Sequence, residues 1–190
     1  MKIAPCSLGP STTIPEARLL DPNFVDALSL PERTSTIDLE KNGELKSYST
    51  DFLFDYDIFP SYVMRHEAEW KQQGRSMNQG DIVIQRAMIP PVGFGFCMEF
   101  AVRICKIIKE ERRIGFAYET LHGHAESGIS EFYFEKMKEG LFFTIHTYSE
   151  PGHWTSKSVR LFSLPYQAWC TRRALNHVKK RFLEENKELG

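Results

Sequence analysis

The sequence predicts an α+β protein in which a curved antiparallel sheet grips a long C-terminal helix. Between residues 81 and 147, apolar residues alternate along successive segments, as in strands with one buried face. From Leu164 to about Glu185 they recur every three or four residues, which places one apolar stripe on a helix. The sheet offers the only large apolar face that could cover this stripe, so we expect the helix to pack on it, with room for a cavity between them.

The part of the chain before the sheet gives weaker patterns. Residues 1–45 are rich in Pro, Ser and Thr and predict an irregular segment that wraps around the domain of residues 46–190, with one short strand near 34–40. A further strand is expected at 46–54. An amphipathic helix is expected near 60–73, because proline suits its first turn and apolar residues follow at helical spacing. The residues that set this spacing are Tyr62, Val63, His66 and Trp70, before Gly74.

Five segments then predict an antiparallel meander, and the last element is the helix. The segments are 81–88, 97–108, 114–121, a strand containing Phe132 and Phe134, and 141–147, with a turn from Gly123 to Gly128. The helix is expected to begin at Leu164, with Ser163 as its N-cap and Pro165 in its first turn. Its predicted stripe consists of Leu164, Ala168, Thr171, Leu175, Val178 and Phe182.

Composition and charge exclude several classes of protein. The 190 residues carry 24 Lys and Arg against 25 Asp and Glu, so the net charge of −1 gives no reason to expect nucleic acid as a partner. Four cysteines lack any C-x-x-C spacing, and no apolar leader opens the chain, which predicts a cytoplasmic protein. The most apolar stretch, residues 87–102, is interrupted by prolines, glycines and Glu99, so no membrane-spanning segment is expected.

Gly123 and Gly128 bracket His124, Glu126 and Ser127 between two strands, and this segment has two interpretations. One is a tight turn whose glycines take positive φ and whose polar side chains bond the backbone. The other is a cavity mouth in which an imidazole and a carboxylate bind or protonate a ligand. His122, His124 and Glu126 alternate as metal-competent residues, with His146 as a further candidate, but alternation requires an extended segment. The sequence therefore predicts no metal site and implies no cofactor.

Residues 115–128, GFAYETLHGHAESG, carry a specific resemblance. They are similar to the DUF1990 family, also called UPF0548, whose usual pattern is close to GFxYGTLPGHPESG. Glu119, His122 and Ala125 depart from that pattern, and weaker agreement extends over roughly residues 50–185. The resemblance implies a START-like, or Bet v 1-like, helix-grip fold, whereas the family's activity is undefined. The positions shared with the pattern include Tyr118, Thr120, Leu121, Gly123, His124, Glu126, Ser127 and Gly128.

The implied fold and the aromatic content of 13% predict a protein that binds a small hydrophobic molecule, lipidic or aromatic, between sheet and helix. A competing hypothesis is an enzyme that performs acid/base chemistry in the same cavity, with His124 and Glu126 handling protons and Tyr118 orienting the substrate. A third is an interaction domain without a cavity. The sequence leaves the oligomeric state open. The expected ligand-binding residues are Phe116, Tyr118, Thr120, His124, Phe143 and Trp154.

Overall fold

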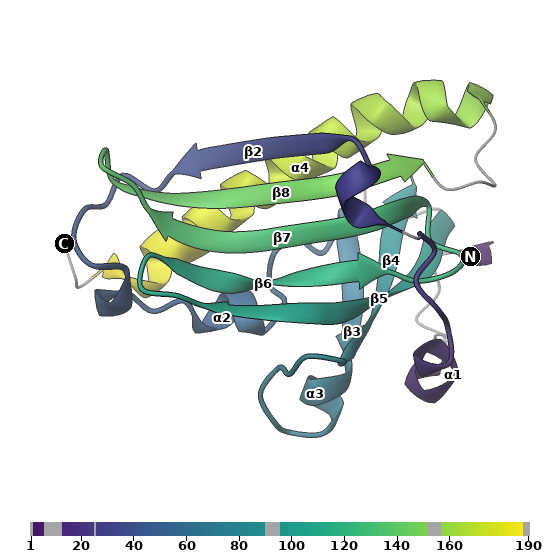
Figure 1. The fold of residues 1–190 in the computed structure, drawn as a ribbon, viewed down its shortest axis with the longest axis horizontal. Coiled ribbons are helices and arrows are strands. Elements are labelled where there is room, and N and C mark those ends of the chain that lie inside the picture. The colour runs from purple at the N-terminus through teal and green to yellow at the C-terminus, as the bar shows by residue number, and fades with distance from the viewer. Residues whose placement is uncertain (1, 6–12, 25, 90–95, 152–156, 188–190) are drawn as a thin grey trace.

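The computed structural model describes residues 2–5, 13–24, 26–89, 96–151 and 157–187. Over these residues the chain forms one antiparallel sheet with a long helix on one face, which confirms the predicted fold class (Figure 1). The strands follow the order β2-β8-β7-β6-β5-β4-β3, and β1 pairs with β5 off this path. The strands are β1 (Lys2–Pro5), β2 (Glu32–Asp38), β3 (Met64–Ala68), β4 (Ile82–Ile89), β5 (Phe96–Lys109), β6 (Arg113–Thr120), β7 (Glu126–Lys136) and β8 (Leu141–Pro151).

The helical elements lie on both faces of the sheet. The long helix α4 runs behind β2, β8 and β7 in Figure 1, and α2 lies on the same face. The short helix α1 packs on the opposite face, where Ile14 and Ala17 contact Ile82 and Ile84 of β4. The helices are α1 (Ile14–Arg18), α2 (Asp51–Phe54), α3 (Glu69–Gln72) and α4 (Lys157–Glu185), with 3₁₀ turns η1 (Ala27–Ser29) and η2 (Leu45–Ser47).

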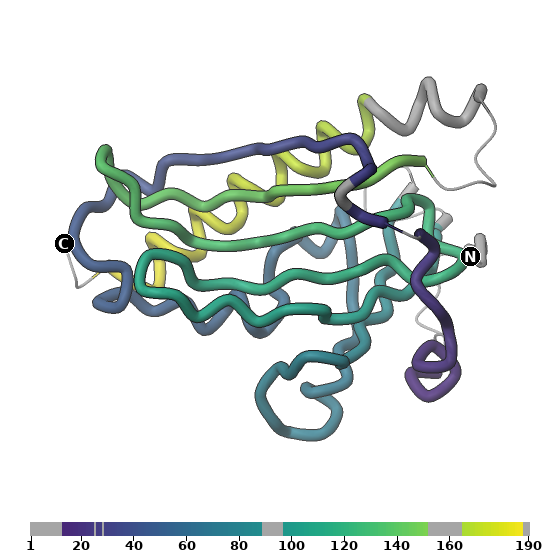
Figure 2. The backbone as a smooth tube through the Cα atoms, in the orientation of Figure 1, coloured from purple at the N-terminus to yellow at the C-terminus, as the bar shows by residue number. Residues whose placement is uncertain are grey.

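The N-terminal segment contributes more regular structure than its composition indicates. The strand expected near 34–40 is present as β2, which pairs along β8 from Glu32 to Asp38. In addition, β1 pairs with the start of β5. The backbone tube in Figure 2 shows this early segment running beside strands that come much later in the sequence. Pairing with β8 and β5, which come much later in the sequence, supplies backbone hydrogen bonds that the composition of the segment itself does not predict.

Two predictions for residues 46–73 are wrong. Residues 46–54 form η2 and α2 instead of a strand, and the adjacent residues Phe52 and Leu53 are both buried, which a strand with one covered face does not allow. The helix expected near 60–73 is a turn followed by β3 and then only one helical turn, α3. The reason is tertiary, because β3 finds a partner in β4, with Met64 opposite Ala87.

The five-strand meander is confirmed as β4 to β8. Its predicted turn at 123–128 is shorter than expected, because β7 already begins at Glu126. Gly123 takes a φ of 87°, and a Cβ on Gly128 would lie 1.9 Å from the carbonyl oxygen of Tyr148. Gly123 is required because its backbone is left-handed, and Gly128 is required because the β8 backbone lies too close for a side chain.

The expected start of the C-terminal helix is also wrong. Helix α4 begins at Lys157 and contains Pro165 in its interior, whereas the side chains of Ser163 and Leu164 lie outside those described. A proline removes one helical hydrogen bond without ending a helix that later turns hold in place. In those turns Ala174, Val178 and Phe182 are fully buried against the sheet.

The core fills one end of the space between sheet and helix. Phe134 contacts the rings of Phe143 and Phe182 with centroid distances of 5.2 Å, and Phe52 of α2 closes this end. Earlier in α4, Thr171 and Leu175 are only partly buried. The sheet and the helix therefore separate toward the start of α4.

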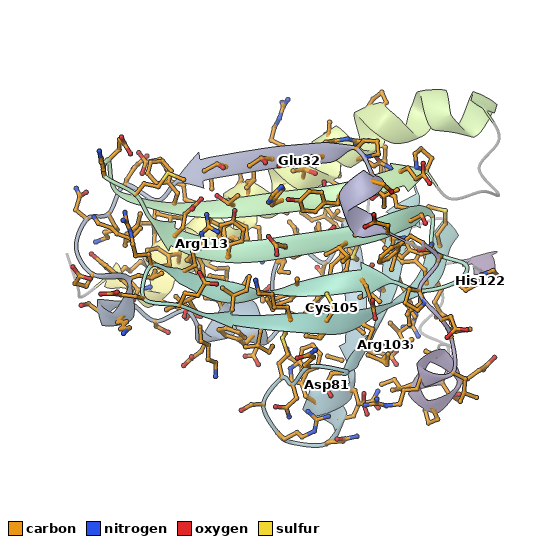
Figure 3. All side chains as sticks on the ribbon, viewed as in Figure 1. Glu32, Asp81, Arg103, Cys105, Arg113 and His122 are labelled. Atoms are coloured by element: carbon orange, nitrogen blue, oxygen red, sulfur yellow. The ribbon has the colours of Figure 1, made fainter. Side chains whose placement is uncertain are left out.

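The face of the sheet opposite α4 carries charged side chains beside the apolar patch that α1 covers. Figure 3 shows Glu32, Cys105 and Arg113 on this outer face, and ion pairs such as Arg113–Glu135 and Arg103–Glu119 cross between its strands. Burial raises the pKa of the Cys105 thiol to about 12, so it stays protonated near neutral pH. The apolar patch of this face at Ile82 and Ile84 is covered by α1, so among the described residues the cavity lies on the other face, under α4.

Candidate ligand cavity

A cavity of about 490 Å³ lies between the concave face of the sheet and residues 166–175 of α4. Its volume is within the range of small-molecule sites. Aromatic and aliphatic side chains form most of its wall. The aromatic residues in the wall are Phe59, Phe100, Tyr118, Phe132 and Tyr166.

A row of polar side chains crosses the concave face between the apolar parts of the wall. Strand pairing sets Tyr118 of β6 opposite Ser130 of β7, Ser130 opposite Thr147 of β8, and Thr147 opposite Arg33 of β2. All four residues line the cavity. Residues paired across strands point to the same face about 5 Å apart, so the row places a polar group on each of four successive strands.

The row ends at a buried polar cluster around Gln85. The Gln85 side chain is 1% exposed, and its Nε2 donates a hydrogen bond to the hydroxyl of Tyr56. Its Oε1 is shielded from water and accepts no hydrogen bond from any group in the described parts of the chain. Burial raises the pKa of Tyr118 to about 12, against the opposing effect of the neighbouring Ser130 and Gln85 side chains. Tyr118 therefore keeps its proton near neutral pH and is a hydrogen-bonding group there.

His124 lies in the turn before β7 and points into the fold. Its Nδ1 accepts a hydrogen bond of 3.0 Å from the backbone amide of Glu126, and its ring packs edge-on against Phe100 at 4.2 Å between centroids. Burial lowers the pKa of this imidazole to about 3, so it is neutral near pH 7. His124 therefore stabilises the turn, and its side chain also lines the cavity.

Glu126 forms a polar cluster with β2, β8 and α4 at the cavity wall. The Ser149 hydroxyl lies 3.4 Å from its carboxylate, and Arg33 reaches Gln167 of α4 with an Nη1–Oε1 distance of 3.4 Å. Burial raises the pKa of Glu126, and the charge of Arg33 acts in the opposite direction. This cluster is where a carboxyl group can exchange a proton or bind a polar substituent.

Three of the ligand-binding residues expected from the sequence lie behind the wall. Phe116 and Phe143 are fully buried in the aromatic core. The Thr120 hydroxyl accepts from the Gly128 amide at 2.8 Å and donates to Asn23 at 2.6 Å, so it holds the turn together. Trp154 falls outside the described residues. Of the expected residues, the structure brings Tyr118, His124 and Glu126 to the cavity.

The metal candidates weighed in the sequence separate in space. His122 is exposed at the turn, His124 points inward, and His146 lies on the outer face with Nε2 2.7 Å from Glu32 (Figure 3). Among the side chains that the structure describes, no three His, Cys, Asp or Glu residues come together as a metal site. The segment turns between His122 and His124, so their alternate positions in the sequence do not bring their side chains to one face.

Sequence reasoning missed Gln85, Ser130 and Arg33. Gln85 was available as a signal, because it is a polar residue on the apolar face of an alternating strand. Ser130 and Arg33 become recognisable only through cross-strand register, which pairs Ser130 with Tyr118 and Thr147, and Arg33 with the distant Thr147.

A cavity between a curved antiparallel sheet and a C-terminal helix defines the helix-grip class of folds. The chain belongs to the DUF1990 family, described as a domain of unknown function, which matches residues 47–177. A search of curated proteins found no match.

Solved structures with a similar fold were found at low sequence identity. The di-domain aromatase/cyclase StfQ from the steffimycin biosynthetic pathway aligns with a TM-score of 0.54 and 12% identity, over 92% of this chain and 54% of that one. This chain therefore spans about half the length of StfQ. The major latex-like protein 151 of Panax ginseng aligns with a TM-score of 0.48 and 14% identity, over 80% of this chain and 97% of that one. At 12% identity the StfQ alignment supports the fold alone.

None of the helices in the described residues is both long enough and apolar enough to cross a bilayer.

Proposed function

We propose that this protein binds a small, largely apolar molecule in the cavity between the sheet and α4. The observation that carries the proposal is the 490 Å³ space itself, walled by aromatic side chains where a protein of this size normally packs its core. Leaving such a space open forfeits packing energy, and a ligand that fills it returns that energy on binding.

Binding accounts for the cavity better than acid/base catalysis by His124 does. Its Nδ1 accepts a hydrogen bond from the Glu126 amide and is not free to act as a base, and its pKa of about 3 leaves it without the acidic proton of an imidazolium near pH 7. An interaction domain is also less well supported, since Leu19 and Tyr62 are the only large exposed apolar side chains among the described residues.

The test uses a solvatochromic dye, 8-anilinonaphthalene-1-sulfonate, with a variant that fills the cavity. Thr171 lines the cavity from α4, so Thr171→Trp should weaken dye binding by about tenfold or more. Thr34 is exposed on β2 and faces away from the cavity, so Thr34→Trp makes the same change outside it and should bind as the wild type does. Wild-type protein that does not bind the dye saturably, or a Thr171→Trp variant that binds it equally well, would contradict the proposal. Native mass spectrometry of the purified protein, followed by organic extraction, then identifies what it carries.

A further inference from the structure

We propose that the ligand is a hydroxylated aromatic molecule, oriented by a hydrogen bond that its hydroxyl donates at Gln85. This inference rests on the proposed function, since it names the chemistry of the molecule bound in the same cavity. Three observations carry it: an unpaired buried acceptor, a polar row beside it, and aromatic walls around both.

The acceptor is the Gln85 amide oxygen. Gln85 is paired with Phe100 across β4 and β5, and both side chains lie on the concave face that lines the cavity. A buried amide oxygen without a donor is destabilising, because it has lost its bond to water and gained nothing in return. Since Nε2 is already engaged with Tyr56, Oε1 is the atom left over, and it requires an N–H or O–H donor.

The polar row explains how such a donor is reached. The oxygen is closed off from water, so a ligand reaches it only when neighbouring side chains shift. Tyr118 lies beside Gln85 at the end of the row, Ser130 is paired with Tyr118, and both hydroxyls can donate or accept hydrogen bonds. A ligand hydroxyl can therefore exchange partners with these groups and end on Gln85 without leaving any of them unpaired.

The walls favour a flat ring system over a flexible chain. The cavity-lining rings of Tyr118 and Phe132 stand 5.3 Å apart, and Phe59 contacts Phe132 from the turn after α2. Phe100, opposite Gln85, forms the wall beside the amide. Aromatic faces and edges attract another ring more strongly than they attract a methylene chain of equal area, and a rigid ligand loses less entropy on binding.

The experiment compares three probes by equilibrium dialysis against the full-length wild-type protein. The first is 2-naphthol, the second is 2-methoxynaphthalene, which keeps the ring and oxygen but lacks the donor, and the third is 1-octanol, which keeps the hydroxyl on a flexible chain. We expect 2-naphthol to bind about tenfold or more tighter than 2-methoxynaphthalene, and several-fold tighter than 1-octanol.

A pair of matched variants assigns the effect to one residue. Gln85→Met removes the amide at nearly constant volume and should reduce the preference for 2-naphthol over its methyl ether to about twofold or less. Gln72→Met makes the same change at an exposed position on α3, outside the cavity wall, and should retain the preference. The comparison of 2-naphthol with its methyl ether uses only the wild-type protein. It can therefore overturn the proposed donor selectivity even if Gln85→Met fails to fold.

The outcomes separate this inference from the proposed function. If no probe binds and the dye does not bind either, the proposed function itself fails. If both naphthalenes bind equally, or the ether binds more tightly, the cavity binds apolar molecules but Gln85 does not select a donor, and the inference is overturned. Tighter binding of 1-octanol than of 2-naphthol overturns the aromatic assignment.

Discussion

His124 makes the stability of this protein depend on pH, and His124→Asn is the perturbation that isolates the effect. Burial lowers the pKa of the imidazole from 6.5 to about 3 in the folded state. Between these two values the unfolded chain binds a proton at this position and the folded chain does not, so stability falls as the pH falls through this window. From pH 7 to pH 5 the loss from this one group is about 2 kcal/mol.

Asparagine is the informative replacement because its side-chain oxygen can accept the same bond. The Nδ1 atom accepts from the amide two residues later, which is the geometry that asparagine adopts when it bonds its own backbone. The variant loses the ring contact with Phe100, so its stability at pH 7 should fall by about 1 kcal/mol or more. Its additional loss on going to pH 5 should be smaller than that of the wild type by about 2 kcal/mol.

The assay is urea denaturation at pH 7 and pH 5 for the wild type, His124→Asn and a control. The control is His122→Asn, which removes an exposed imidazole from the same turn. Burial also lowers the pKa of His66, so the total pH dependence has more than one source and only the difference between variants is diagnostic. The reasoning is refuted if His124→Asn retains the wild-type pH dependence, or if His122→Asn reduces it by as much.

Three further predictions concern residues at and behind the cavity wall. Thr120→Val removes the acceptor of the buried Gly128 amide and should cost about 1–3 kcal/mol in urea denaturation while leaving dye affinity unchanged; a loss of affinity in the folded variant would return Thr120 to the binding site. Phe143→Ala, in the core beyond the cavity, should cost about 3–5 kcal/mol, and a cost below about 1 kcal/mol would show that this end is not packed. Glu126→Gln should raise the melting temperature at pH 8, where the buried carboxyl with a raised pKa is forced to ionise, and this gain should disappear at pH 4; a gain equal at both pH values would show that ionisation is not its cause.

The alternation of apolar residues was sufficient to predict the meander and its burial pattern. Met98, Phe100, Val102 and Ile104 alternate with other residues along β5, and they line the cavity and the core beneath α4. Such a prediction succeeds because each strand must bury one face whatever its neighbours are. The family resemblance added Tyr118, His124 and Glu126, which all reach the cavity.

Local spacing failed where a partner distant in sequence decided the conformation. Residues 64–68 have a spacing compatible with a helix, but pairing with β4 gives this edge strand inter-strand backbone hydrogen bonds from a partner that a local spacing does not show. The Glu69 carboxylate adds to this, since it binds Arg18 of α1 and the backbone amide of Ile82. These contacts span 51 and 13 residues and leave no trace in a short window of sequence.

The sequence by itself determined the fold class, the antiparallel order of the meander and the presence of an apolar helix stripe, because these follow from periodicity that every residue carries locally. Only the tertiary structure decided which aromatic residues fill the core and which surround a cavity. Phe116 and Phe132 are equivalent in pattern, yet Phe132 lines the cavity and Phe116 does not. The difference arises because Phe54 and Tyr56, at the end of α2 and just after it, cover Phe116 with ring-centroid distances of 6.5 and 5.7 Å. Where that segment packs on the sheet is a property of the relative placement of the two, which the alternation along a strand does not contain.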